Sequence, residues 1–302
     1  MGGLALREIG HPSTTDLTMH SRSSIIVSMN RLTTERRVAV VKALVEGCSI
    51  RATVRLTGVS KNTIVKLLVE LGAACSTYQN EHLRNLSCKR LQLDEIWSFV
   101  GKKDRQLTGE EKDRGFGLGS VWTWTAIDAD TKLIPSWLVS SRDAGAAFEF
   151  AHDLASRVNG RVQITSDGHK AYATAVPDAF GLDCDFAMLQ KIYGQSPDDR
   201  RYSPRVCLGS RCDTVLGTPD PAHISTSHNE RQNLTMRMSM RRFTRLTNAF
   251  SKKVENHAAA VALYFMYYNF ARVHQTLRVT PAIEAGVSDH VWSVEEIVGL
   301  LT

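Results

Sequence analysis

Three carboxylates from separate parts of the chain could together bind a divalent metal. Asp94 lies inside the apolar run 91–100, Asp167 follows the short run 161–166, and Glu230 lies near the start of a long basic segment. Magnesium prefers carboxylate oxygens and leaves coordination positions open for phosphate and water. An acid within a strand, an acid at a strand's end and an acid on a late helix therefore predict a metal site that could act on phosphodiesters.

The first position of this set has two candidates, because Glu95 is adjacent to Asp94. Neighbouring residues of a strand point to opposite faces of a sheet, so we expect only one of the two to join the site. Each acid also has an ordinary structural explanation. Asp167 could be a turn residue before Gly168, and Glu230 could stabilise the positive end of a helix. The residues by themselves favour Asp94 and leave these alternatives open.

The composition indicates a basic, soluble, intracellular protein. The 302 residues carry a formal net charge of +6, a pI near 9.0 and a hydrophobic fraction of 43%. Basic residues are concentrated between positions 231 and 253, which favours a nucleic-acid partner. No apolar run is long enough to cross a bilayer, so we expect no membrane contact. Six scattered cysteines argue against a secreted disulfide framework and predict reduced thiols.

The length accommodates one large domain and one small domain. The first residues are rich in Ser, Thr, Gly and His without any periodicity, and Met29 is an alternative start to Met1. The predicted regions are a disordered leader at 1–30, a helix-turn-helix domain at 31–75, a linker at 76–90, a large domain at 91–275 with an irregular insertion at 177–227, and a C-terminal tail helix at 276–302.

Residues 31–75 have the pattern of a helix, a turn and a capped helix. Helical periodicity ends at Gly47, a short helix fits residues 49–56, and the Ser60 hydroxyl could cap a third helix at 61–71. This order is typical of a helix-turn-helix, whose recognition helix enters the DNA major groove by its N-terminus. A small helical bundle without DNA contacts is the alternative. The candidates for contacts with phosphates and bases are Lys61, Asn62, Thr63 and Lys66.

The large domain is predicted to be α/β, with a mixed sheet. Its apolar runs alternate with turn residues and then with longer helical patterns. Aromatic residues of the last helix are expected to pack in the core. The expected elements are strands at 91–100, 119–127 and 133–140, a charged loop at 101–117, a helix at 144–158, a strand at 161–166, a further strand near 183–187, and helices at 227–242 and 253–270.

Three blocks of residues resemble the DDE transposases of the insertion sequence one family. They occur in order along the chain and span residues 90–275. The blocks are residues 93–103 with Asp94, residues 166–172 with Asp167, and residues 229–237 with Glu230, followed by Arg245-Leu246-Thr247 and Phe250-Ser251-Lys252-Lys253. The resemblance implies a ribonuclease-H-like catalytic core, preceded here by the small all-α helix-turn-helix domain.

The same resemblance implies a chemistry. Asp94, Asp167 and Glu230 would be the catalytic triad of an enzyme that cleaves and joins DNA strands at the ends of an insertion sequence. Two Mg²⁺ or Mn²⁺ ions would be bound, with Asp94 between them, Asp167 on one and Glu230 on the other. The implied partners are double-stranded DNA, both terminal repeats and target, and further copies of the chain. The implied location is the cytoplasm of a bacterium, in association with the nucleoid.

Basic side chains near the three acids are candidates for DNA contacts. Arginines recur every four residues from position 237 to position 245, which would place them on one face of a helix. Such a face would bind the DNA backbone with an affinity that falls as salt rises. A solvated basic face is the alternative. The candidates are His169, Lys170, Arg231, Arg237, Arg241 and Arg245.

A zinc site is a competing interpretation of four other residues. Cys207 and Cys212, with His223 and His228, have the spacings of zinc ligands within each pair. They lie in sequence broken by Pro and Gly, without the apolar positions of a zinc finger. We therefore expect reduced cysteines and surface histidines instead of a structural zinc. Members of the family often carry an N-terminal zinc finger, whereas no cysteine precedes Thr33.

Two other functions are compatible with the same residues. A structure-selective nuclease on the same fold would cut DNA without joining it. A DNA-binding regulator derived from a transposase would keep the acids without using them. Strand transfer by the purified protein distinguishes both from a transposase. The sequence predicts neither the terminal repeats nor the transposition route.

Overall fold

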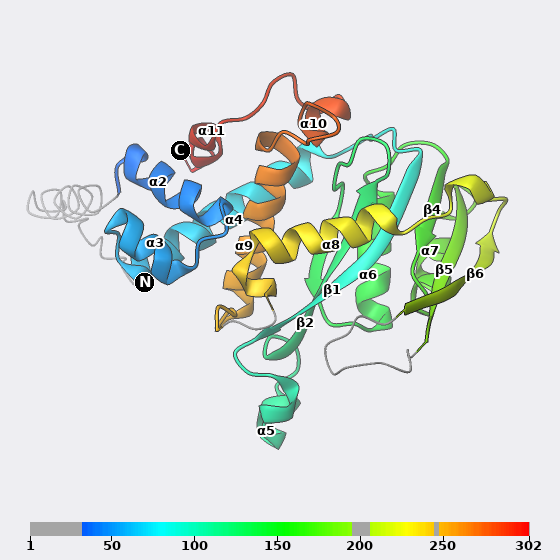
Figure 1. Cartoon of the computed structure of the whole chain (residues 1–302), viewed down its shortest axis with the longest axis horizontal. Helices are drawn as coiled ribbons and strands as arrows, with labels where there is room; N and C mark the ends of the chain where they lie inside the picture. The colour runs from blue at the N-terminus through cyan, green and yellow to red at the C-terminus, as the bar shows by residue number, and fades with distance from the viewer. Residues whose placement is uncertain (1–31, 195–205, 245–247, 302) are drawn as a thin grey trace, which may run out of the picture.

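The computed structural model describes residues 32–194, 206–244 and 248–301. The predicted leader at residues 1–30, including Met29, and the candidate Arg245 lie outside these ranges. The described chain is a mixed α/β protein in which a six-stranded sheet is flanked by helices (Figure 1). Its buried apolar side chains form one continuous core that includes the N-terminal helices.

Three capped helices form the N-terminal part. They are α2 (Thr34–Val45), α3 (Ile50–Thr57) and α4 (Lys61–His82). Each begins after a hydroxyl that accepts a hydrogen bond from the backbone N–H three residues later, and these hydroxyls belong to Thr33, Ser49 and Ser60. Gly58 ends α3 in the left-handed conformation, with a φ of 64°. The predicted helices and the Ser60 cap are confirmed, whereas α4 extends beyond its predicted end at residue 71.

The predicted linker at 76–90 is instead largely structured. Helix α4 continues to His82 and packs along α9 (Val254–Met266). The helices approach so closely at Gly72 that a Cβ there would lie 2.5 Å from Ala259 Cα. The buried side chain of Gln79 donates to the carbonyl of Ala262. Helix packing, and not chain flexibility, therefore joins the N-terminal helices to the sheet.

The sheet has both parallel and antiparallel neighbours, in the order β3-β2-β1-β4-β5-β6. Strands β1, β2 and β3 pair antiparallel, β4 and β5 run parallel to β1, and β6 returns antiparallel to β5. The parallel pairing of β1 with β4 places Ser166, the last residue of β4, beside Leu93 in the first half of β1. The strands are β1 (Arg90–Val100), β2 (Gly119–Asp128), β3 (Trp137–Ser140), β4 (Val162–Ser166), β5 (Cys184–Gly194) and β6 (Val206–Leu216).

Helices cover both faces of this sheet. On one face, α6 (Ala144–Ala155) and α7 (Tyr172–Phe180) pack around Trp124 of β2. On the other, α8 (Ser227–Ser239) crosses β1 and β2, as Figure 1 shows. Tyr264, Phe265 and Tyr268 are buried, which confirms their prediction as core residues, whereas Tyr267, predicted with them, is half-buried against the core.

Several expected boundaries were wrong. The strand predicted at 133–140 begins at Trp137. The loop at 101–117 contains η1 (Asp104–Gln106) and α5 (Gly109–Asp113). The irregular insertion at 177–227 contains all of β5 and β6, and η2 (Pro221–His223). Strand β6 is an edge strand with exposed residues on both faces, so its sequence lacks the alternation that identifies a half-buried strand.

The C-terminal part differs from the predicted tail helix. After α9 the chain forms a π-helical turn, η4 (Tyr267–Ala271), and then two short helices, α10 (Pro281–Glu284) and α11 (Val294–Gly299). Helix α11 packs on α2, where Lys42 Nζ lies 2.8 Å from Glu295 Oε1. Among the described helices, none has the length and apolarity to cross a membrane.

Candidate active site

The first turn of α8 is fixed to the sheet by a buried amide. The Nδ2 of Asn229 donates to the carbonyls of Gln92 and Thr125, both at 2.9 Å, and its Oδ1 accepts from the Thr125 hydroxyl at 2.9 Å. The Gln92 side chain in turn accepts from the backbone N–H groups of His228 and Asn229. These bonds determine where the next residue, Glu230, lies over β1.

We expect Asn229→Ala to lower the free energy of unfolding by about 2–4 kcal/mol, because each buried group that loses its partner costs about 1–3 kcal/mol. Chemical denaturation monitored by circular dichroism measures this loss. The matched control is Asn159→Ala, at an exposed position, which should stay within about 0.5 kcal/mol of the wild type. Equal effects of the two substitutions would show that Asn229 does not anchor α8.

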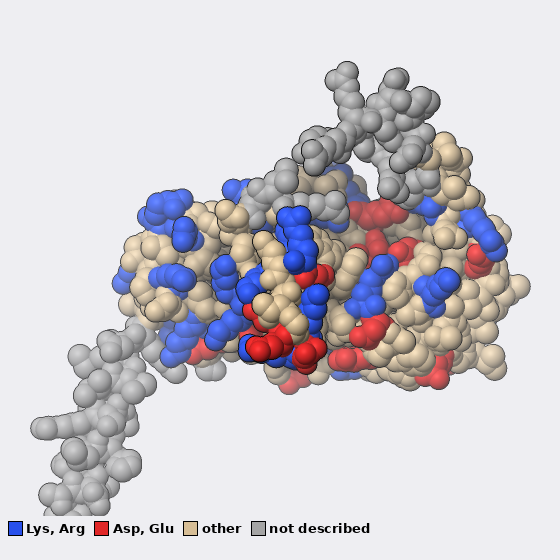
Figure 2. All heavy atoms as spheres, turned by 90° about the horizontal axis from the view of Figure 1, so that it is seen from below, with Lys and Arg blue, Asp and Glu red and all other residues tan. Residues whose placement is uncertain are grey.

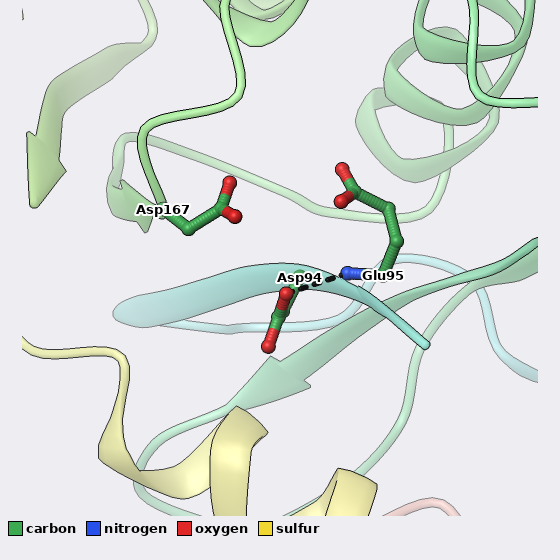
Figure 3. Close-up of side chains that lie close together, drawn as sticks. All are labelled: Asp94, Glu95 and Asp167. Carbon is green, nitrogen blue, oxygen red and sulfur yellow. Dashed lines mark hydrogen bonds between the residues drawn. The ribbon is translucent and has the colours of Figure 1, made fainter. Parts of the chain in front are cut away.

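Three carboxylates meet where β1 and β4 lie side by side. Asp94, Glu95 and Asp167 each offer one oxygen, and these oxygens lie within 4.8 Å of one another, an arrangement that could hold a metal ion (Figure 3). Asp94 Oδ2 accepts from the amide of Asn233 at 2.8 Å, and Asp167 Oδ1 accepts from the backbone N–H of His169 at 3.0 Å. The two aspartates predicted from the sequence are therefore brought together.

The inclusion of Glu95 contradicts the prediction that only one of the adjacent acids joins the site. Alternation along β1 does separate the side chains, because Asp94 faces Asn233 of α8 while Glu95 lies on the side of Tyr172 of α7. Asp167 lies beyond the end of β4, where a carboxylate from either face of β1 can reach it. The acid cluster therefore takes residues from both faces of the sheet.

Glu230 lies in the same cleft but outside this cluster. Its Oε1 is bound by Lys191 Nζ of β5 and accepts from the Thr226 hydroxyl at 2.8 Å. The acid cleft has a volume of about 780 Å³, and Glu230 lines it together with the three clustered acids. The predicted third acid is thus at the site, with its charge neutralised by a lysine from the neighbouring strand.

Burial and mutual repulsion disfavour the charged forms of two acids. Burial, followed by the charge of Asp167, raises the pKa of Asp94 to about 7 and that of Glu95 to about 8. One guanidinium opposes this effect, since Arg142 lies 3.2 Å from Glu95 Oε2 and 3.9 Å from Asp167 Oδ2. Among the described residues, nothing hydrogen-bonds to Glu95 Oε1. A hard divalent cation would stabilise such a set of oxygens.

The candidate DNA contacts are divided between places. His169, Lys170 and Arg237 line the acid cleft, whereas Arg231 is exposed on α8 and does not line it. The prediction that Arg237 and Arg241 share one helical face was wrong, because α8 ends at Ser239. Met240 adopts an extended conformation, with φ −127° and ψ 106°, and so turns the chain away from the helix axis.

The four candidate residues of the N-terminal part lie together on the first turns of α4. Lys61, Asn62 and Lys66 are exposed, while Thr63 is half-buried and its hydroxyl lies 2.8 Å from that of Ser60. The side chains at the start of α4 are therefore accessible to a partner.

The possible zinc ligands are placed separately. Cys207 and Cys212 are exposed on β6, His223 lies 2.7 Å from a guanidinium nitrogen of Arg90, and His228 lies beside Lys132. Within the part of the chain that the structure describes, the acid cluster is the one group of side chains spaced for a metal.

Sequence reasoning missed the residues that hold the acids in place. Asn229 and Asn233 are four residues apart and both buried, which is the spacing of one helical face. Two asparagines on one helical face could have indicated a buried polar contact with the sheet, since buried amides need specific hydrogen-bond partners. Arg142 and Lys191 had no such signal, because their acidic partners are distant in the sequence.

Comparisons with known proteins add no identification. No protein-family model matches the chain, and no curated protein matches it either.

Proposed function

We propose that this protein is a metal-dependent DNA transposase of the DDE type. The observation that carries the proposal is the acid cluster of Asp94, Glu95 and Asp167, with Glu230 in the same cleft. The proposed ions are Mg²⁺ or Mn²⁺, two of them, which would activate the attacking oxygen and stabilise the leaving oxygen of a phosphodiester. Asp94, Asp167 and Glu230 would hold them, and Glu95 is an additional candidate ligand.

The fold supports this assignment. A central strand flanked by an antiparallel hairpin on one side and parallel strands on the other is compatible with a ribonuclease-H-like core. The capped helices α3 and α4, separated by Gly58, are compatible with a helix-turn-helix that would recognise the ends of the element. The proposed partners are double-stranded DNA and further copies of the chain, in the bacterial cytoplasm.

The residues of the acid cleft have separable roles in this proposal. Asn233 and Arg142 orient Asp94 and Glu95, while Asn229 sets the position of Glu230. Lys191 neutralises Glu230 and would have to release it when Glu230 binds a cation. The basic residues of the cleft would bind the phosphates beside the scissile bond. Positioning and charge thus suffice, and no side-chain nucleophile is required.

Strand transfer by the purified protein tests the proposal. The substrate is a labelled DNA fragment that carries the element's own ends. The variant is Glu230→Gln, and the separate control is Glu149→Gln, which changes an exposed acid of α6. Joined product that requires Mg²⁺ or Mn²⁺ and disappears in Glu230→Gln alone supports a transposase. Metal-dependent cutting without joining indicates a nuclease. Binding of the ends with neither reaction indicates a DNA-binding regulator.

A further inference from the structure

A second cleft lies between the N-terminal helices and the segment that follows α8. It has a volume of about 1240 Å³ and shares no lining residue with the acid cleft. One wall comes from α3 and α4, and the other comes from residues 239–242, 248–253 and part of α9. We call it the basic cleft, because of the residues given below.

The wall formed by α3 and α4 presents exposed cations. They are Arg51, Lys61 and Lys66. The single acid among the lining residues is Glu70, whose carboxylate lies 3.7 Å from Lys66 Nζ. Figure 2 shows Lys and Arg side chains spread over the side of the molecule where α3 and α4 lie, with fewer Asp and Glu among them. This wall therefore has an excess of positive charge.

The opposite wall is also cationic. Arg241, Arg242, Lys252 and Lys253 line it, and the two lysines are exposed. Lys252 Nζ lies 3.9 Å from the centre of the Phe250 ring, which holds the ammonium group at the cleft by a cation–π contact. Cations thus face one another across the cleft with little acid to balance them.

Arg242 is the most informative of these residues, because it is half-buried and no acidic group among the described residues contributes to its electrostatics. Its Nη1 donates to the Ser251 hydroxyl at 2.6 Å, and that hydroxyl lies 3.1 Å from the ring of the buried His257. Burial lowers the pKa of Arg242 to about 10, so the side chain is still charged near neutral pH. A partly buried charge without a counter-ion is costly, and a bound anion would remove that cost.

Helix α8 connects the two clefts. Glu230 and Arg237 line the acid cleft, whereas Ser239, at the end of the same helix, lines the basic cleft. A polyanion that enters at the first turn of α4 could therefore follow one path along the molecule to the acids.

We infer that the basic cleft binds the sugar-phosphate backbone of double-stranded DNA, so that one DNA segment contacts both α4 and the acid cleft. This inference rests on the proposed function. Cations on two facing walls suit a backbone with phosphates on two strands, which is why DNA fits better than an acidic peptide. The inference adds four cations to the predicted DNA contacts, namely Arg51, Arg242, Lys252 and Lys253.

The experiment measures the affinity of the full chain for a short labelled duplex by fluorescence anisotropy at several salt concentrations. The variant is the double substitution Lys252→Gln and Lys253→Gln. The matched control is Lys112→Gln with Arg114→Gln, which removes the same charge from exposed positions at α5. We expect the variant to bind roughly tenfold more weakly. The slope of the logarithm of the binding constant against the logarithm of the salt concentration should become shallower by about 2, since each phosphate contact contributes about 0.9 to it. The control should match the wild type.

Two further measurements keep the outcomes distinct. Arg242→Gln should also weaken binding, and its melting temperature shows whether the fold survives. If Lys252→Gln with Lys253→Gln binds with the affinity and salt slope of the wild type, the basic cleft does not bind DNA. Polyaspartate serves as a probe for acidic peptides. If the variant binds polyaspartate more weakly than the wild type does but binds the duplex equally well, the cleft is a peptide site and the inference is wrong. Failure of the wild type to bind duplex at all would overturn the proposed function itself.

Discussion

Asp94→Asn is expected to abolish metal-dependent DNA cleavage and joining while making the metal-free protein more stable. Activity should fall by about a hundredfold or more, because a ligand that orients the reacting phosphate is lost. The melting temperature should rise, because the raised pKa of Asp94, about 7, shows that its charged form is unfavourable in the fold. We expect a gain of about 1–3 kcal/mol above that pH, since one pKa unit corresponds to about 1.4 kcal/mol.

The two effects separate a catalytic role of Asp94 from a structural one. Asn keeps an oxygen that can accept from Asn233, so the contact between α8 and β1 should persist. Strand-transfer assays and differential scanning calorimetry without metal provide the two measurements. Asp113→Asn, at an exposed position of α5, is the control and should change neither. A destabilised or fully active Asp94→Asn protein would contradict the assignment of Asp94 to the metal site.

Mg²⁺ or Mn²⁺ should raise the melting temperature strongly in alkaline solution and little in acid. The pKa values of Asp94 and Glu95, about 7 and about 8, lie above the ordinary carboxyl values near 4. Without metal, these acids therefore reduce stability progressively as the pH rises from about 4 to about 8. A bound cation favours the ionised forms, so its stabilisation is largest above about pH 8 and disappears as protons displace it below about pH 6.

Thermal scans with and without metal, at equal ionic strength, measure this dependence. At a metal concentration about a hundred times the dissociation constant, the expected stabilisation is about 2.7 kcal/mol. Asp167→Asn should remove most of the metal-induced rise in melting temperature, because Asp167 is one of the three acids spaced to hold the metal. Asp113→Asn should retain that rise. The same shift at every pH, or in Asp167→Asn, would place the metal elsewhere.

The sequence by itself determined several of the elements and the two aspartates of the acid cluster. Ser60 and Gly58 mark the boundary of α4 because capping and a left-handed turn depend on a few adjacent residues. Strands β1 and β2 were recognisable from their apolar runs. Of the two aspartates that meet, Asp94 lies in β1 and Asp167 directly follows β4. These features are local, so the chain shows them without its partners.

Only the tertiary structure decided how those elements combine. Glu95 joins the cluster because β4 ends where side chains from both faces of β1 can reach Asp167. Arg142 and Lys191 are assigned to Glu95 and Glu230 by packing between segments distant along the chain. Strand β6 and the second half of α4 depend likewise on their neighbours. The charge partners of the acids are properties of the assembled fold, so no local pattern could have predicted them.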